Sequence, residues 1–205
     1  MMINEIKASF SENKKTIFLS VAILFISLIM GYVLEPHLYS YFNPVVEDLT
    51  QKVQTGTLTL TFADIFLNNF RIIFQMFVFG IACCFSAFML AFNGFFVGYY
   101  IGASDDIVRV LLLIVPHGIF EFSSIILACT SGLVLFNSLY IFLKTLWLDK
   151  NESLTLSLKN AFNACSKKIK HAVIIFLTAS ILMVIAGIVE VYFTIPIAEF
   201  IIKFL

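Results

Sequence analysis

The chain has 205 residues, of which 60% are hydrophobic and only 13% charged, and its mean hydropathy is +1.00. A water-soluble domain carries about 25% charged residues, so this composition excludes an ordinary soluble domain and predicts one integral membrane domain in contact with the lipid bilayer. The 13 basic and 13 acidic side chains cancel, so no overall positive charge points to a nucleic acid as a partner. The four cysteines show no CxxC spacing, and we interpret them as small apolar side chains rather than a zinc or redox site.

The first membrane-crossing segment is expected at residues 16–34, which contain no charged residue. A crossing helix needs about 20 apolar residues. The exit Leu34-Glu35-Pro36 has no small-residue cleavage site, so we predict a retained span and not a signal peptide. Residues 35–70 follow as a polar segment, with a short amphipathic helix expected after Pro44 and a break at Gly56.

The second span is expected at residues 72–92, and the region after it is ambiguous. Residues 94–116 are interrupted by acidic residues near Asp105 and by Pro116. They form either one discontinuous span or the end of a long second helix and a short re-entrant piece. A clear span is expected at residues 119–143, then a lysine-rich amphipathic loop at 144–171 and the last span at 172–195. The predicted fold is therefore all-α: a polytopic membrane helical bundle of about five membrane elements, one of them discontinuous or re-entrant near residues 94–120.

Lysine and arginine bias predicts the orientation, because loops rich in these residues stay in the cytoplasm. The N-terminus and residues 144–171 are lysine-rich, whereas residues 35–70 are acidic. We therefore expect a cytoplasmic N-terminus, an external 35–70 segment and an external C-terminus. This requires an odd number of crossings between residues 70 and 143, either three or one with a re-entrant hairpin. The 144–171 loop is either an ordinary positive loop or a helix lying on the anionic inner leaflet.

His117 and Glu121 lie inside an apolar segment, where a charge costs roughly 2.5–3.5 kcal/mol at the bilayer centre. They are four residues apart, so in a helix they share one face and can touch. Pro116 suits the first turn of a helix, and Gly118 would let a neighbouring backbone come close. Further polar residues lie within or near the apolar segments: Asn68, Asn69, Asn93 and Glu190.

Three interpretations of this polar core remain open. The pair could clamp helices together, with Glu190 or an asparagine completing the network. It could relay protons or ions in a transporter. It could supply two ligands of a metal site, which is a weak hypothesis because HExxH is absent and His37 and His171 are expected at the membrane surfaces. No phosphate loop, nucleotide fingerprint or GxSxG motif occurs, so we expect neither enzymatic activity nor a cofactor.

Gly94, Gly98 and Gly102 recur every four residues, which is a repeated small-xxx-small pattern. Such a series permits close helix packing, either within one chain or between two copies in a homo-oligomer. Gly132 is expected to serve packing in a similar way.

Several of these marks occur together in one order: FLNNF at residues 66–70, Gly80, NGFFVG at 93–98, PHGIFE at 116–121 with Gly132 downstream, and IVEVYFTIPI at 188–197. In this the chain resembles the stage II sporulation protein M family. The resemblance implies about five helices in the plasma membrane of a prokaryote, and a scaffold that anchors extracytoplasmic cell-wall enzymes. It implies a shared core without an assigned role, consisting of Asn93, Gly94, Pro116, His117, Gly118 and Glu121.

The sequence thus favours a membrane scaffold without enzymatic activity, which binds partners through its 35–70 segment or its 144–171 segment. The alternative is a small-solute or ion transporter or channel that uses His117, Glu121 and Glu190. An intramembrane metal site or hydrolase is the third interpretation.

Overall fold

The structure is a computed structural model that describes residues 2–54, 61–82, 84–149 and 153–203. Its helices are α1 (Met2–Glu12), α2 (Lys14–Gln54), α3 (Phe62–Val78), the 3₁₀ turn η1 (Phe79–Ile81), α4 (Phe85–Gly102), α5 (Ile107–Leu148), α6 (Leu154–Tyr192) and α7 (Thr194–Ile202). The described residues contain no strand, and five of the helices are long and apolar enough to cross a membrane. The predicted all-α membrane bundle is therefore confirmed.

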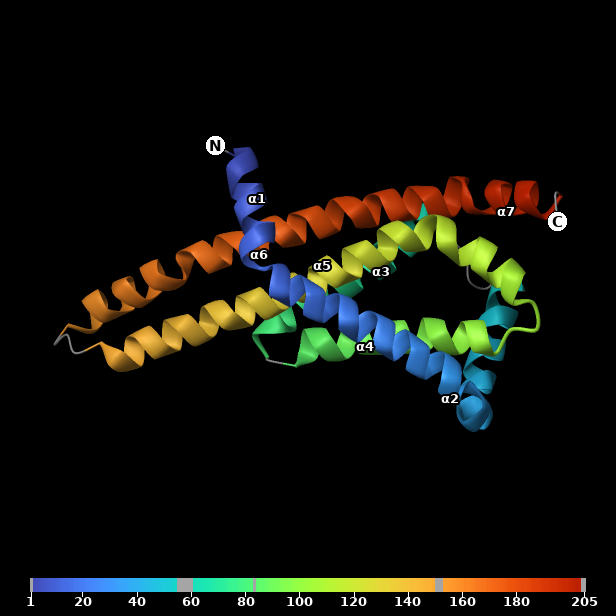
Figure 1. The fold of residues 1–205 in the computed structure, drawn as a ribbon, viewed down its shortest axis with the longest axis horizontal. Helices are drawn as coiled ribbons and strands as arrows, with labels where there is room; N and C mark the ends of the chain where they lie inside the picture. Colours follow the sequence, from blue (N-terminus) through green and yellow to red (C-terminus); the bar gives the residue numbers. More distant parts are fainter. Residues whose placement is uncertain (1, 55–60, 83, 150–152, 204–205) are drawn as a thin grey trace.

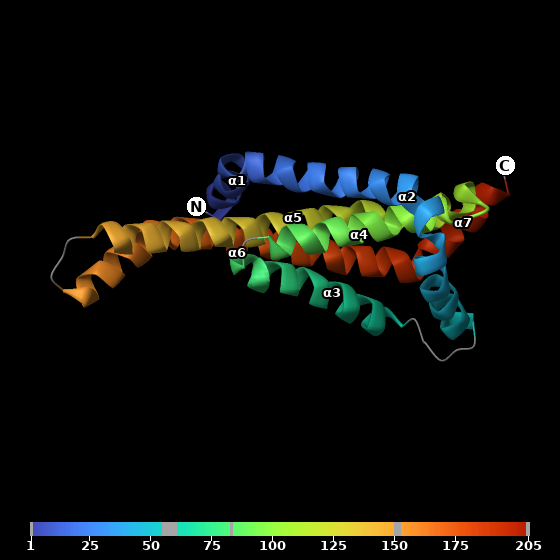
Figure 2. The same cartoon turned by 90° about the horizontal axis from the view of Figure 1, so that it is seen from below.

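Helices α5 and α6 lie side by side over most of their length, and the other helices pack around one part of this pair (Figures 1 and 2). Helices suit this composition because each satisfies its backbone hydrogen bonds internally, as the hydrocarbon core requires. The core gathers apolar side chains from α2, α3, α4, α5 and α6, among them Leu24, Met76, Leu90, Ile125 and Met183. One polar contact also crosses the pair: the buried Ser124 hydroxyl donates to the Ala179 carbonyl at 2.7 Å.

The expected span at residues 72–92 is wrong, because the chain reverses direction inside it (Figure 2). Helix α3 ends at Val78 and α4 begins at Phe85. The turn packs against α5, where a Cβ on Gly80 would overlap the backbone of Gly132. Ser86 fixes the start of α4 by donating to the Met76 carbonyl at 2.5 Å. Hydropathy gives no sign of this turn, because its residues are as apolar as the helices on either side.

The expected element at residues 94–116 is also wrong as a unit. Helix α4 ends at Gly102, and α5 begins at Ile107 behind an N-cap in which Asp106 accepts the Arg109 N–H at 3.0 Å. Pro116 does not start a helix but lies inside α5, which changes direction in its first half (Figure 1). A proline inside a helix removes one backbone hydrogen bond and bends the helix, which accounts for the change. Between residues 62 and 148 the chain therefore has three candidate spans.

Helices α2 and α3 both extend into the polar segment expected at residues 35–70. Helix α2 continues through Pro36 and Pro44 to Gln54, so the expected short helix is the end of α2. Helix α3 begins at Phe62, with Thr61 as its N-cap. The expected break at Gly56 lies outside the described residues.

The expected loop at residues 144–171 consists almost entirely of helix. Helix α5 continues to Leu148 and α6 begins at Leu154. The apolar face expected to lie on the inner leaflet packs partly against α5, since Ala161 and Cys165 are buried. The last span, expected at 172–195, belongs to this same α6, which ends at Tyr192 before α7. At 42 and 39 residues, α5 and α6 are about 63 and 58 Å long, twice the roughly 30 Å of the hydrocarbon core.

The glycine series of α4 packs against α2 of the same chain. A Cβ on Gly98 would overlap the Leu28 carbonyl, and one on Gly94 would overlap the Ser27 hydroxyl. Gly31 of α2 completes the contact, because a Cβ there would overlap the Phe95 carbonyl. The glycines therefore allow the two backbones to touch, and their close-packing face is occupied within the chain.

Candidate functional site

His117 and Glu121 lie one turn apart on α5, as their spacing predicts. The His117 Nε2 and Glu121 Oε2 atoms are 3.9 Å apart, which is too far for a hydrogen bond and close enough for an ion pair when the imidazole is protonated. Their side chains are 14% and 27% exposed, so neither is sealed inside the protein.

Thr194, at the start of α7, holds the other nitrogen of His117. The His117 Nδ1 atom is 3.2 Å from the Thr194 hydroxyl, and that hydroxyl donates to the Val189 carbonyl at 3.2 Å. Because the hydroxyl has one hydrogen and gives it to Val189, it accepts from Nδ1–H. The network therefore assigns the Nδ1 tautomer and leaves Nε2 of a neutral His117 as an acceptor facing Glu121.

The pair lines an open groove of about 280 Å³ between α4 and α5. The α4 wall is Phe96, Val97 and Tyr100, and the α5 wall adds Ile114 and Phe122. One imidazole and one carboxyl group thus stand in an otherwise aromatic and aliphatic groove. Sequence reasoning missed Thr194 and the α4 wall, because only the tertiary packing brings them to His117.

Glu190 of α6 is half-buried and does not line the groove. The described residues contain no group of three His, Cys, Asp or Glu side chains placed to hold one metal ion.

The three asparagines do not join this pair in a network. Asn93 donates to the Met89 carbonyl of its own helix at 2.8 Å, although it lies on the α4 face that also carries Val97 and Tyr100. Asn68 is exposed and Asn69 is half-buried on α3, and neither lines the groove.

Two glycines of α5, Gly118 and Gly132, have different environments. Gly118 is buried, but a Cβ there would meet only side chains of its own helix, the nearest being Ile114 at 3.4 Å. The expected close approach of a neighbouring backbone at Gly118 is therefore wrong. Gly132 does meet such a backbone, because a Cβ there would overlap the Met76 carbonyl.

A second polar cluster joins α1 to α6 around His171, whose side chain is fully buried. Asn13 donates to the Ser9 carbonyl at 2.7 Å, accepts from Lys168 at 3.0 Å, and places its amide nitrogen 3.3 Å from His171 Nδ1. We call these contacts, with the two ion pairs described next, the α1–α6 latch. The sequence shows acidic residues in α1 and lysines in the first half of α6. It does not show that these two segments lie next to each other.

Two exposed ion pairs complete the latch. Glu12 pairs with Lys167 at 2.7 Å and Glu5 with Lys170 at 3.1 Å. The hydrogen bond from Lys167 holds the pKa of Glu12 below its ordinary value, because it favours the charged carboxylate.

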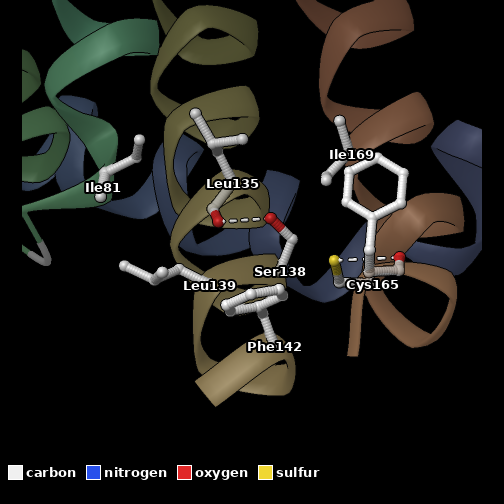
Figure 3. Close-up of a pocket in the computed structure, with 8 residues that line it drawn as sticks. Ile81, Leu135, Ser138, Leu139, Phe142, Cys165 and Ile169 are labelled. Atoms are coloured by element: carbon white, nitrogen blue, oxygen red, sulfur yellow. Dashed lines mark hydrogen bonds between the residues drawn. The ribbon is translucent and has the colours of Figure 1, made fainter. Parts of the chain in front are cut away.

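A further cavity of about 190 Å³ lies among η1, α5 and α6 (Figure 3). Leu135, Leu139, Phe142 and other apolar side chains line it. Its two polar side chains are satisfied locally, since Ser138 and Cys165 bond to carbonyls of their own helices at 2.6 and 3.3 Å. This cavity therefore offers space for an apolar group, and its two polar side chains are already hydrogen-bonded.

These features define a class: a polytopic helical membrane protein with an imidazole–carboxyl pair in a groove between two helices. The family model for stage II sporulation protein M matches residues 16–195, and the chain belongs to that family. It is similar to two uncharacterised proteins of Methanocaldococcus jannaschii. One is 32% identical over 70% of this chain and 76% of the relative, and the other 28% identical over 96% and 89%. No solved structure matches the chain.

Proposed function

We propose that this protein is a non-enzymatic scaffold of a prokaryotic plasma membrane, with its N-terminus in the cytoplasm and its C-terminus outside. The observation that supports it most is the length of α5 and α6, which continue together well beyond the ends of α2, α3 and α4 (Figures 1 and 2). A protein that only had to span the bilayer would not need this extension.

Charges indicate where the extension leaves the bilayer. The ion pairs of Glu5 and Glu12 with α6 lie near Lys170, and charges this dense belong outside the hydrocarbon core. On α5, Gly132 contacts the turn that ends α3. Residues 133–148 of α5 and 154–170 of α6 form the end of the hairpin, which we call the arm; η1 and α1 contact only its base. Sixteen residues of helix give the arm about 24 Å of length.

The arm suits a protein partner on its α6 side. That helix presents exposed polar residues there, among them Lys159, Asn163 and Ser166. The lysine bias favours the cytoplasmic side, and the positive charge favours an acidic surface on the partner. The outer segment at residues 35–70 would be a second docking place for the cell-wall enzymes that the family resemblance implies.

The scaffold is tested by photocrosslinking in cells from a probe at Asn163. We expect crosslinks to a defined partner, which weaken when Lys159 is changed to Glu and persist in Glu121→Gln, because Gln still forms hydrogen bonds in the groove. The proposal fails if the arm crosslinks to no protein, or if the crosslinks survive Lys159→Glu and disappear in Glu121→Gln.

A transporter or channel for a small solute or ion is the second candidate, and the open groove favours it. Glu121 faces the groove and has only a 3.9 Å contact to His117, so its proton could exchange with a bound solute. In proteoliposomes, Glu121→Gln should abolish proton-coupled flux and leave the protein folded. Glu199→Gln, at an exposed acid of α7, is the matched control and should leave the flux unchanged.

A metal site or hydrolase remains the third candidate. It requires metal in the purified protein that is lost on His117→Ala. Metal analysis of both proteins decides this candidate, because the scaffold requires no bound metal.

A further inference from the structure

We propose that the groove between α4 and α5 binds a primary or secondary ammonium group attached to an apolar body. The ammonium lies between His117 and Glu121, and the apolar body lies along the aromatic walls. The site does not depend on the scaffold function. It uses the groove that favours the transporter candidate, but binding requires no transport, so the two are tested separately.

His117 and Glu121 present two hydrogen-bond acceptors to each other and no donor. The Nδ1–H of His117 is given to the Thr194 hydroxyl, so Nε2 of the neutral ring offers a lone pair. Glu121 Oε2 lies 3.9 Å from that nitrogen, and within the described part of the chain no group donates a hydrogen bond to this carboxylate. Two facing acceptors of this kind are satisfied by a donor that lies between them.

The separation of 3.9 Å suits a single nitrogen atom that carries at least two hydrogens. Such a nitrogen can lie about 2.8 Å from both acceptors, which is the usual length of a charge-assisted hydrogen bond. Primary and secondary ammonium groups have these hydrogens, whereas a quaternary ammonium has none. A water molecule can also donate to both atoms, but it leaves the charge of the carboxylate unpaired.

An ionised Glu121 gives the groove a negative charge that its walls do not balance. Among the described residues that line the groove, none is a lysine or an arginine. A carboxylate in a membrane-crossing segment is costly unless a partner offsets its charge. An ammonium group supplies this partner, and the same lining makes an anion a poor ligand.

The walls of the groove suit the apolar part of such an amine. Phe96 and Tyr100 of α4 and Phe122 of α5 line it beside Val97 and Ile114. Aromatic rings offer apolar area and attract cations that lie over their faces. The volume of about 280 Å³ is near the lower end of the range for ligand pockets, about 300–1,000 Å³. A small apolar body, or part of a lipid chain, therefore fits.

The test is equilibrium binding of phenethylammonium to the full-length protein in nanodiscs made without amine-bearing lipids. Calorimetric titration measures the binding, and empty nanodiscs correct for amine that dissolves in the lipid. Phenethyl alcohol and phenylacetate are the matched probes, because they keep the ring and carry a neutral or an anionic group instead. This comparison uses the unmodified protein and depends on no variant.

Three variants locate the site. Glu121→Gln keeps the size of the side chain and removes its charge, and Phe96→Leu removes one ring of the wall. Glu199→Gln, at an exposed acid of α7, is the control. Thermal unfolding checks that each variant is folded.

We expect saturable binding of phenethylammonium to the unmodified protein and much weaker binding of the other two probes. The affinity should fall about ten- to a hundredfold in Glu121→Gln, because a hydrogen bond to a charged group is lost. It should fall about two- to fivefold in Phe96→Leu, as the loss of a cation–π contact predicts. Glu199→Gln should bind like the unmodified protein.

The proposal is overturned if the unmodified protein binds no amine beyond the empty nanodiscs, as expected of a pair that holds only water. It is also overturned if phenethyl alcohol or phenylacetate binds as tightly, or if folded Glu121→Gln binds like the unmodified protein. Nanodiscs with phosphatidylethanolamine distinguish two sources of the same chemistry. Competition by this lipid assigns the site to a lipid headgroup, and undiminished binding assigns it to a free amine.

Discussion

At the residue scale, glycines determine how closely α2 and α4 approach each other. A methyl group on Gly98 would overlap the Leu28 carbonyl, which is backbone and cannot rotate away. We expect Gly98→Ala to force the helices apart and to cost about 1–3 kcal/mol, as overpacking does. Unfolding in a denaturing detergent measures this loss.

The matched control is Gly118→Ala. There the nearest atom to the added methyl group would be a side-chain carbon 3.4 Å away, which is an ordinary contact. This variant should unfold like the parent protein. Equal losses at both positions would show that α2 and α4 are not held together by the glycine contact.

The Glu12–Lys167 pair makes part of the stability depend on pH. The pKa of Glu12 lies below its ordinary value of 4.5, chiefly because Lys167 donates to the carboxylate. A carboxyl group with a lowered pKa stabilises the folded state above its unfolded-state pKa, and this contribution disappears as the pH falls through the folded-state pKa. Stability should therefore decline more in the parent than in Glu12→Gln between about pH 5 and pH 3. Thermal unfolding across this range measures the difference, and parallel curves would contradict the pairing.

At the element scale, the latch decides whether α1 stays on α6. Asn13 connects Ser9, Lys168 and the buried His171 ring. Asn13→Ala removes these bonds and leaves Nδ1 of His171 buried without its partner, which costs about 1–3 kcal/mol. We expect hydrogen exchange in residues 2–12 to accelerate. Asn163→Ala, at an exposed position of α6, is the control and should change nothing; unchanged exchange in Asn13→Ala would show that α1 is held by other contacts.

The elements that hydropathy could predict are those bounded by charges or a change of composition. The first span begins after Lys14 and Lys15, and the break near Asp105 was visible because acids are costly in hydrocarbon. The turn near Gly80 was missed because it is itself apolar and rests on Gly132, 52 positions away. Helix α6 was divided because its first half is lysine-rich, although helices continue readily through lysine.

The candidate site, like the helices, was predictable from the sequence only in part. The spacing of His117 and Glu121 places both on one face of any helix, so their proximity followed from sequence. Thr194 and the aromatic wall from α4 did not, because they are far apart in the chain and meet only through packing. Asn68 and Asn69 were assigned to the predicted polar core only because they are polar. Polarity does not show which neighbouring helix a side chain faces.

At the scale of the whole molecule, the account rests on five crossings and an arm on the side of the N-terminus. An odd number of crossings places the turn at residues 103–106 opposite the arm. The turn at η1 and the arm share a side, since α3 and α4 form an antiparallel pair (Figure 2). Reagents that cannot cross a membrane can test on which side each of these turns lies.

The most direct measurement is labelling of single cysteines, introduced at Ser104 or Asn163 after the native cysteines are replaced, with a membrane-impermeant reagent in intact and opened cells. We predict that Ser104→Cys is labelled in intact cells and Asn163→Cys only after the membrane is opened. Labelling of both positions from the same side would contradict five crossings and place the arm elsewhere. Protection of Asn163→Cys even in opened cells would show that the arm is embedded, and the scaffold account would fail with it.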